Sequence, residues 1–207
     1  MLNHSHIEIA AQGLVGDLCT VEDSRGLVVF VHGSGSSRLS RRNVRVAESM
    51  QRRQLDTLLF DLLTPDEADD RAKVFDIALL ASRVLEALAA LGARPGTPSN
   101  IGLFGASTGA AAALVAAARR PNSVQAVVSR GGRPDLAGDA LPQVRAPTLL
   151  IVGAADTEVL QLNREALTLL GCAKRIEIVP RATHLFQEAG TLETWPCSPA
   201  NGSNSTC

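Results

Sequence analysis

Apolar runs with the length of β-strands alternate with segments of helical periodicity along most of this chain. The runs are rich in Val, Ile and Leu, which is typical of parallel strands buried on both faces. The predicted strands are residues 26–33, 55–63, 100–105, 124–129, 146–153 and 174–180, and the predicted helices include 40–53, 72–91 and 157–170. Residues 5–22 predict an antiparallel N-terminal hairpin. This alternation favours an α/β fold with a mostly parallel open sheet and helices on both faces.

The domain organisation expected from this pattern is simple. The 207 residues are 45% hydrophobic, which suits one compact domain with a sizeable core. No linker divides the strand–helix alternation, because residues 93–99 have the length of an ordinary loop. We therefore expect a single domain over residues 1–189. The final stretch, 190–207, is polar and contains two prolines, so we expect an irregular, mobile tail.

Composition argues against several classes of protein. The net charge is −1 and aromatic residues make up 3% of the chain, so neither nucleic acid nor a membrane is an expected partner. No run of 18 apolar residues and no secretory leader is evident. The cysteines are scattered without metal-site spacing, at Cys19, Cys172, Cys197 and Cys207. These features predict a cytoplasmic protein with reduced thiols and with no metal or cofactor.

The stretch GLFGASTGAA contains the pattern Gly-x-Ser-x-Gly, from Gly105 to Gly109. A predicted strand precedes the pattern, and an alanine-rich helix that stops at Pro121 follows it. A strand, a sharp turn and a helix are the context that a nucleophilic serine requires, so Ser107 is the candidate nucleophile. The alternative is that Ser107 only caps a buried helix.

A serine hydroxyl needs a base to remove its proton, and the chain has four histidines. His4 and His6 form an H-x-H pair near the N-terminus, where exposed side chains are a simpler interpretation than a metal site. His32 ends a buried strand, which suits a structural role. His184 follows the last predicted strand, at the same edge of the sheet as Ser107, and is the candidate base. A surface-loop histidine is its alternative.

A third side chain must orient the base, and Asp156 is the candidate. It lies three residues beyond Gly153, just past the end of a predicted strand. The nucleophile, acid and base then follow one another in the order of the α/β-hydrolase arrangement. Asp135, Asp139 and Glu158 are competitors, and a helix-capping role for Asp156 is a further alternative.

Two further sets of groups complete the predicted site. The oxyanion of an acyl-transfer reaction needs two N–H donors, for which we predict those of Thr108 and Ser34. Arg38 follows the loop of Ser34, and Arg130 and Arg133 leave a strand end at the active edge. Arg38 and Arg130 are candidates for binding a substrate carboxylate, with a structural or solvated role as the alternative.

The chain resembles the α/β-hydrolase superfamily, and within it the small dienelactone-hydrolase-related group. The matching stretches include VVFVHGSGSSR, IGLFGASTGAAAAL, VVSRGGRPDLAG and APTLLIVGAADTEVLQLN, and coverage runs from about residue 14 to 188. Dienelactone hydrolase is similar but carries cysteine where this chain has Ser107. The family also closes with a long C-terminal helix, which the residues after His184 do not predict, and this bears on whether a homodimer forms.

Together, the residues and the resemblance imply a carboxylic ester hydrolase that forms an acyl-enzyme. Only about fourteen residues separate the stretches VQAVVSRGG and APTLLIVG, where many lipases insert a cap. We therefore expect no cap domain, an open cleft and small short-chain esters as substrates. A thioesterase or acyltransferase with the same triad is one alternative. A catalytically silent module is another, because in relatives of this kind a hydrolase domain sometimes accompanies a phosphoribosyltransferase.

Overall fold

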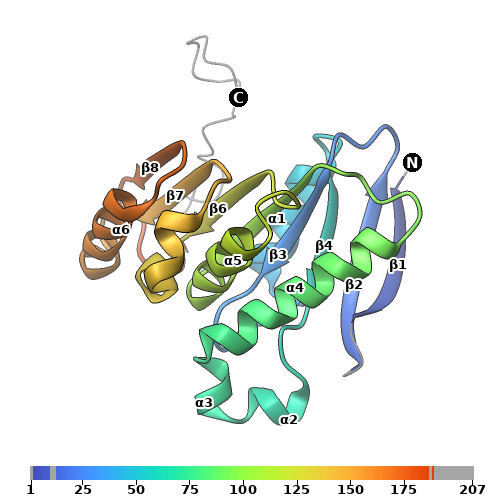
Figure 1. Cartoon of the computed structure of the whole chain (residues 1–207), viewed down its shortest axis with the longest axis horizontal. Coiled ribbons are helices and arrows are strands. Elements are labelled where there is room, and N and C mark those ends of the chain that lie inside the picture. The colour runs from blue at the N-terminus through green and yellow to red at the C-terminus, as the bar shows by residue number, and fades with distance from the viewer. Residues whose placement is uncertain (1, 10–12, 187, 189–207) are drawn as a thin grey trace.

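The computed structural model describes residues 2–9, 13–186 and 188 (Figure 1). The predicted tail, 190–207, lies outside the described residues.

One sheet of eight strands runs through the molecule, in the order β1-β2-β4-β3-β5-β6-β7-β8 (Figure 1). The strands are β1 (Leu2–Ile9), β2 (Leu14–Val21), β3 (Leu27–Val31), β4 (Asp56–Phe60), β5 (Ile101–Ala106), β6 (Ala126–Arg130), β7 (Thr148–Gly153) and β8 (Lys174–Val179). β2 pairs antiparallel with both β1 and β4, and the pairs from β4 to β8 are parallel. The predicted mostly parallel sheet with an antiparallel N-terminal hairpin is confirmed.

Helices cover both faces of this sheet, as the sequence predicted. The helical segments are α1 (Arg41–Gln51), α2 (Pro65–Ala68), α3 (Arg71–Val74), α4 (Ile77–Ala93), α5 (Thr108–Arg119), the 3₁₀ segment η1 (Pro134–Gln143) and α6 (Thr157–Leu169). In Figure 1, α4, α5 and η1 lie in front of the sheet and α1 lies behind it. All the parallel strands end at one edge, so the loops that follow β3, β5, β7 and β8 meet there.

Successive side chains of the central strands explain why both faces are covered. Along β3, Val29 belongs to the larger core cluster together with residues of α4 and α5, whereas Phe30 packs with Val46 and Ala47 of α1. The same alternation occurs in β5, where Leu103 faces the larger cluster and Phe104 faces α1. Because both sets of side chains are apolar, neither face of these strands could remain in water without a large cost.

The segment between β4 and α4 differs from the prediction. The expected helix over 72–91 is split, since α3 ends at Val74 and α4 begins at Ile77. The cause is Asp76, whose side chain accepts a hydrogen bond from the N–H of Leu79 at 2.9 Å and so starts a new helix. This segment contributes part of the wall of a cavity beside the loop that follows β3.

The connection from β6 to β7 contains η1 and no larger insertion, in agreement with the expected lack of a cap domain. Leu141 of η1 is fully buried in the main core, and the segment packs against α5 and α6. No helix in the described part of the chain is long and apolar enough to span a bilayer.

Candidate active site

The turn between β5 and α5 holds Ser107 in a conformation that few residues other than glycine adopt. Its φ is 50° and its ψ is −126°, a backbone strain that typically costs about 1–3 kcal/mol. Ser107 stands at the N-cap position of α5, but its side chain makes no capping hydrogen bond. The half-buried hydroxyl is therefore not used as a helix cap, which was the alternative interpretation of the motif.

The loops after β7 and β8 bring Asp156 and His184 together. The Nδ1 atom of His184 lies 2.7 Å from Oδ2 of Asp156, so the imidazole and the carboxylate share a hydrogen bond. Backbone contacts hold the two loops, because the N–H of Ala155 donates to the carbonyl of Ala182 at 3.0 Å. Asp156 stands at the N-cap of α6 without capping it, so its carboxylate is free to orient the imidazole.

A carboxylate that competed for this role has another partner in the structure. Asp135 accepts hydrogen bonds from the guanidinium of Arg133, at 2.9 Å from Nε and 2.8 Å from Nη2. The same contacts raise the pKa of Arg133 and occupy its guanidinium. Asp156 is therefore the carboxylate that the structure brings to His184.

The loop after β3 approaches the turn of Ser107 from the other side. A Cβ atom on Gly33 would lie 2.7 Å from Cβ of Ser107, so only glycine allows this approach. The backbone N–H of Ser34 donates to the hydroxyl of Thr108 at 3.0 Å. Thr108 begins α5, where the first N–H groups of a helix have no partner within the helix. Both predicted oxyanion donors therefore lie at the turn, and that of Ser34 is engaged by a hydroxyl.

His32 fixes the start of this loop from inside the protein. Its Nε2 accepts a hydrogen bond from the N–H of Leu62 at 3.1 Å, which leaves the proton on Nδ1 for donation to the carbonyl of Gly33 at 3.0 Å. Burial lowers the pKa of His32 from its ordinary value, against smaller opposing effects of the Gly33 carbonyl and of Asp61. The imidazole is thus held neutral and links the ends of β3 and β4.

From this buried imidazole we predict that the free energy of unfolding depends on pH. The folded protein binds fewer protons at His32 than the unfolded chain does, so the contribution is complete above an unfolded pKa of 6.5 and is lost as the pH falls toward the lowered folded value. As the pH falls from about 7.5 to 5, we expect the free energy of unfolding, measured in urea, to decrease more steeply for wild type than for His32→Asn, because asparagine does not titrate. Parallel pH profiles for the two proteins would contradict this role.

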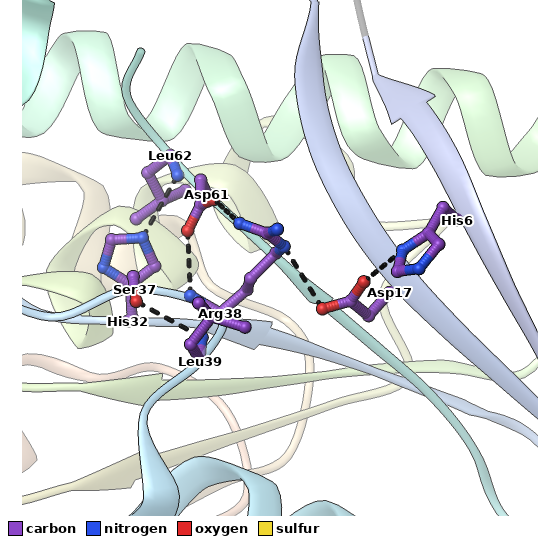
Figure 2. A network of polar contacts seen from close by, with 8 residues as sticks. All are labelled: His6, Asp17, His32, Ser37, Arg38, Leu39, Asp61 and Leu62. Atoms are coloured by element: carbon purple, nitrogen blue, oxygen red, sulfur yellow. Dashed lines mark hydrogen bonds and ion pairs between the residues drawn. The ribbon is translucent and has the colours of Figure 1, made fainter. Parts of the chain in front are cut away.

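Arg38 lies in a polar network beside the loop and not in the cavity of Ser107 (Figure 2). Its guanidinium forms ion pairs with Asp61 of the β4 end and with Asp17 of β2, and Asp17 also contacts His6 at 2.6 Å. Its backbone N–H donates to Asp61 at 2.8 Å. The guanidinium of Arg38 is thus paired with two carboxylates. It does not line the cavity that contains Ser107, so this arrangement does not support the expectation that Arg38 contacts substrate.

Arg130, the other candidate arginine, lines the same cavity as Ser107 and His184. The cavity has a volume of about 250 Å³. The guanidinium Nη2 of Arg130 donates to Oδ1 of Asn43 at 3.0 Å, a partner on α1 that the sequence reasoning missed. Burial, with a smaller effect of the charge of Arg42, lowers the pKa of Arg130 to about 10. The cavity therefore combines a serine, an imidazole and a buried cation.

No group of three or more His, Cys, Asp and Glu side chains that could hold a metal occurs in the part of the chain that the structure describes.

A model of the α/β-hydrolase fold family matches residues 26–181, and the chain therefore belongs to this family. Within the family it is a relative of dienelactone hydrolase. Its sequence is 52% identical to that of dienelactone hydrolase from Anabaena variabilis, whose crystal structure superposes with a TM-score of 0.88. The match covers 93% of this chain and 92% of that chain. Est1E from Butyrivibrio proteoclasticus, 15% identical with a TM-score of 0.75 over 91% of this chain and 93% of that one, shares the fold.

Curated relatives from two strains of Mycobacterium tuberculosis are considerably longer. Both are provisionally named phosphoribosyl transferase, and both are 58% identical to this chain over 181 residues. The match covers 87% of this chain and 41% of each relative, so the chain spans about two fifths of their length.

Proposed function

We propose that the protein is a serine carboxylic ester hydrolase that acts on small, short-chain esters through an acyl-enzyme. The observation that carries the proposal is the 2.7 Å hydrogen bond between Asp156 and His184, formed at a cavity that Ser107 also lines. A nucleophile on a strained turn, a base and an orienting carboxylate are the parts that acyl transfer requires. Membership of the α/β-hydrolase fold family supports a hydrolase, and the triad is the finer step proposed here.

In the acylation step, the hydroxyl oxygen of Ser107 attacks the carbonyl carbon of the ester. Nε2 of His184 accepts the serine proton as the new C–O bond forms. The tetrahedral intermediate then expels the alcohol, which takes this proton from His184, and the acyl group remains on Ser107. Asp156 keeps the proton of the neutral imidazole on Nδ1, so that Nε2 is free to act as the base, and it stabilises the imidazolium once that forms.

In the deacylation step, a water molecule takes the place of the alcohol. His184 removes a proton from the water as its oxygen attacks the acyl carbon. Collapse of the second tetrahedral intermediate breaks the bond to Ser107, which regains its proton from His184, and the carboxylic acid leaves.

The negative charge of each intermediate is stabilised by the N–H groups of Thr108 and Ser34. The N–H of Ser34 is bound to the hydroxyl of Thr108 in the present arrangement, so we propose that it turns from this hydroxyl to the oxyanion when substrate is present. Hydrogen bonds in active sites commonly tighten only in the complex with substrate. Loss of one such donor typically lowers kcat by about 10²- to 10³-fold.

The cavity volume and the short connection between β6 and β7 limit the size of the substrate. A volume of about 250 Å³ suits a small ester, and η1 is the only segment that the described structure places between β6 and β7. The transferase activity in the name of the Mycobacterium tuberculosis proteins is not part of this proposal, because the match covers 41% of their length.

The test is whether a covalent intermediate forms on Ser107. In rapid mixing with p-nitrophenyl acetate, we expect a burst of p-nitrophenol that is stoichiometric with protein if deacylation is the slower step. A fluorophosphonate probe should label the protein irrespective of that rate, and peptide mass analysis should place the label on Ser107. Labelling should be strongly slowed in His184→Ala, which lacks the base. Label on another residue, or none at all, would overturn the proposal.

A further inference from the structure

Arg130 is a buried cation that no carboxylate of the described residues neutralises. Arg130 is the last residue of β6, and it is only 8% exposed. Asn43 accepts a hydrogen bond from Nη2, and the guanidinium lies 5.4 Å from the centre of the Phe104 ring, but Nη1 is buried and has no hydrogen-bond partner. No carboxylate among the described residues forms an ion pair with Arg130. A neutral amide and an aromatic ring compensate only part of the cost of burying this charge.

The N-terminus of α1 adds positive potential beside Arg130. Ser40 is the N-cap residue, but its side chain makes no capping hydrogen bond, and the first turn of this 11-residue helix contains no acidic residue. Arg41 and Arg42 stand there instead. The partial positive charge of a helix N-terminus favours acidic neighbours, so two arginines at this end oppose the usual preference. An anion bound here would relieve this unfavourable accumulation of charge.

These groups converge on the cavity of the proposed catalytic residues. Ser40, Arg42, Asn43 and Arg130 line the cavity together with Ser107 and His184. We propose that this positively charged end of the cavity is an anion subsite, in which a carboxylate or phosphate group of the substrate pairs with Arg130 and Arg42 while the ester carbonyl lies at Ser107. The inference rests on the proposed esterase function and names the class of ester that it acts on.

The test compares aryl acetates that carry different groups, charged or neutral, at the para position of the ring. The three substrates are 4-acetoxybenzoate, 4-acetoxyphenyl phosphate and methyl 4-acetoxybenzoate, which carry the same acetyl group and a carboxylate, a phosphate or no charge. We expect kcat/KM for at least one anionic ester to exceed that of the neutral ester by about 10- to 100-fold, the worth of a charge-assisted contact. Whichever anion gains more identifies the group that the subsite accepts. Added salt should reduce the preference.

Three variants assign the preference to its residues. In Arg130→Gln and in Arg42→Gln, we expect the ratio of anionic to neutral kcat/KM to fall by at least about 10-fold. Arg42 is only half-buried, so its variant keeps the test valid if Arg130→Gln fails to fold. Arg120→Gln is the matched control, because Arg120 lies at the far end of α5 from Ser107, and its ratio should equal that of wild type.

The outcomes separate the subsite from the esterase function. The subsite is overturned if kcat/KM of wild type is equal for the neutral and the anionic esters, and if the ratio of anionic to neutral kcat/KM does not change in Arg130→Gln or Arg42→Gln. The esterase function stands in that case. If no ester is hydrolysed, the function fails, and calorimetric titration with benzoate and with inorganic phosphate judges the subsite alone. Binding that is lost in both variants supports the subsite, and no binding to wild type overturns it.

Discussion

Replacement of Ser107 by alanine is expected to lower kcat for p-nitrophenyl acetate by on the order of 10⁴- to 10⁶-fold, because loss of the nucleophile removes the acyl-enzyme route. The free energy of unfolding should remain the same or increase slightly, since the hydroxyl caps nothing and the strained φ of 50° persists with alanine. Initial rates at saturating ester, corrected for the rate without protein, provide the measurement.

Ser82→Ala is a matched control for this experiment. Its hydroxyl donates to the carbonyl of Leu79 within α4, so the variant removes a serine hydroxyl elsewhere in the fold. We expect its kcat to equal that of wild type. Ester hydrolysis that survives in Ser107→Ala, or a fluorophosphonate label that persists there, would show that another residue is the nucleophile.

Gly109→Ala should have the largest effect on folding. A Cβ at this position would lie 2.2 Å from the carbonyl oxygen of Val31 and 2.4 Å from that of His32. Both obstacles are backbone atoms, so no side chain can rotate to make room, and α5 would have to move away from the end of β3. We expect a loss of about 3 kcal/mol or more in the free energy of unfolding, or no folded protein at all, measured by urea denaturation.

Gly92→Ala separates this packing effect from the helix propensity of alanine. Gly92 lies near the end of α4, and a Cβ there would meet nothing within 4 Å. The same substitution should therefore leave stability unchanged or raise it by up to about 1 kcal/mol. If Gly109→Ala were as stable as Gly92→Ala, the close contact between α5 and β3 would be wrong.

The strands could be predicted well from sequence because burial on both faces leaves an unmistakable pattern. The predicted run 26–33 contains β3, and the predicted run 146–153 contains β7. The short helices α2 and α3 left no such pattern, since neither contains a buried residue and periodicity needs a buried face to appear. Capping contacts set where they begin: Thr64 and Glu67 form a capping box at α2, and Asp70 accepts from the N–H of Ala72 at α3.

The proposed catalytic residues were predictable for a different reason. Parallel strands end at one edge, so residues just past strand ends are brought together even when they are far apart in the chain. This places Asp156 beside His184 without any knowledge of loop conformation. The arginines show the limit of this reasoning. Arg38 lies in the loop after β3 and Arg130 is the last residue of β6. Only the folded structure reveals that Arg38 pairs with two carboxylates, whereas no carboxylate among the described residues pairs with Arg130.

The position of His184 after the last described strand has a consequence for biosynthesis. A ribosome completes the proposed nucleophile at residue 107 and the orienting carboxylate at residue 156 before it adds the base. The parallel pairing of β7 with β8 then carries the imidazole to Asp156. A nascent polypeptide released at residue 180 would possess most of the sheet and yet lack a proton acceptor for Ser107. The proposed site is thus complete only after β8, the last described strand, has joined the sheet.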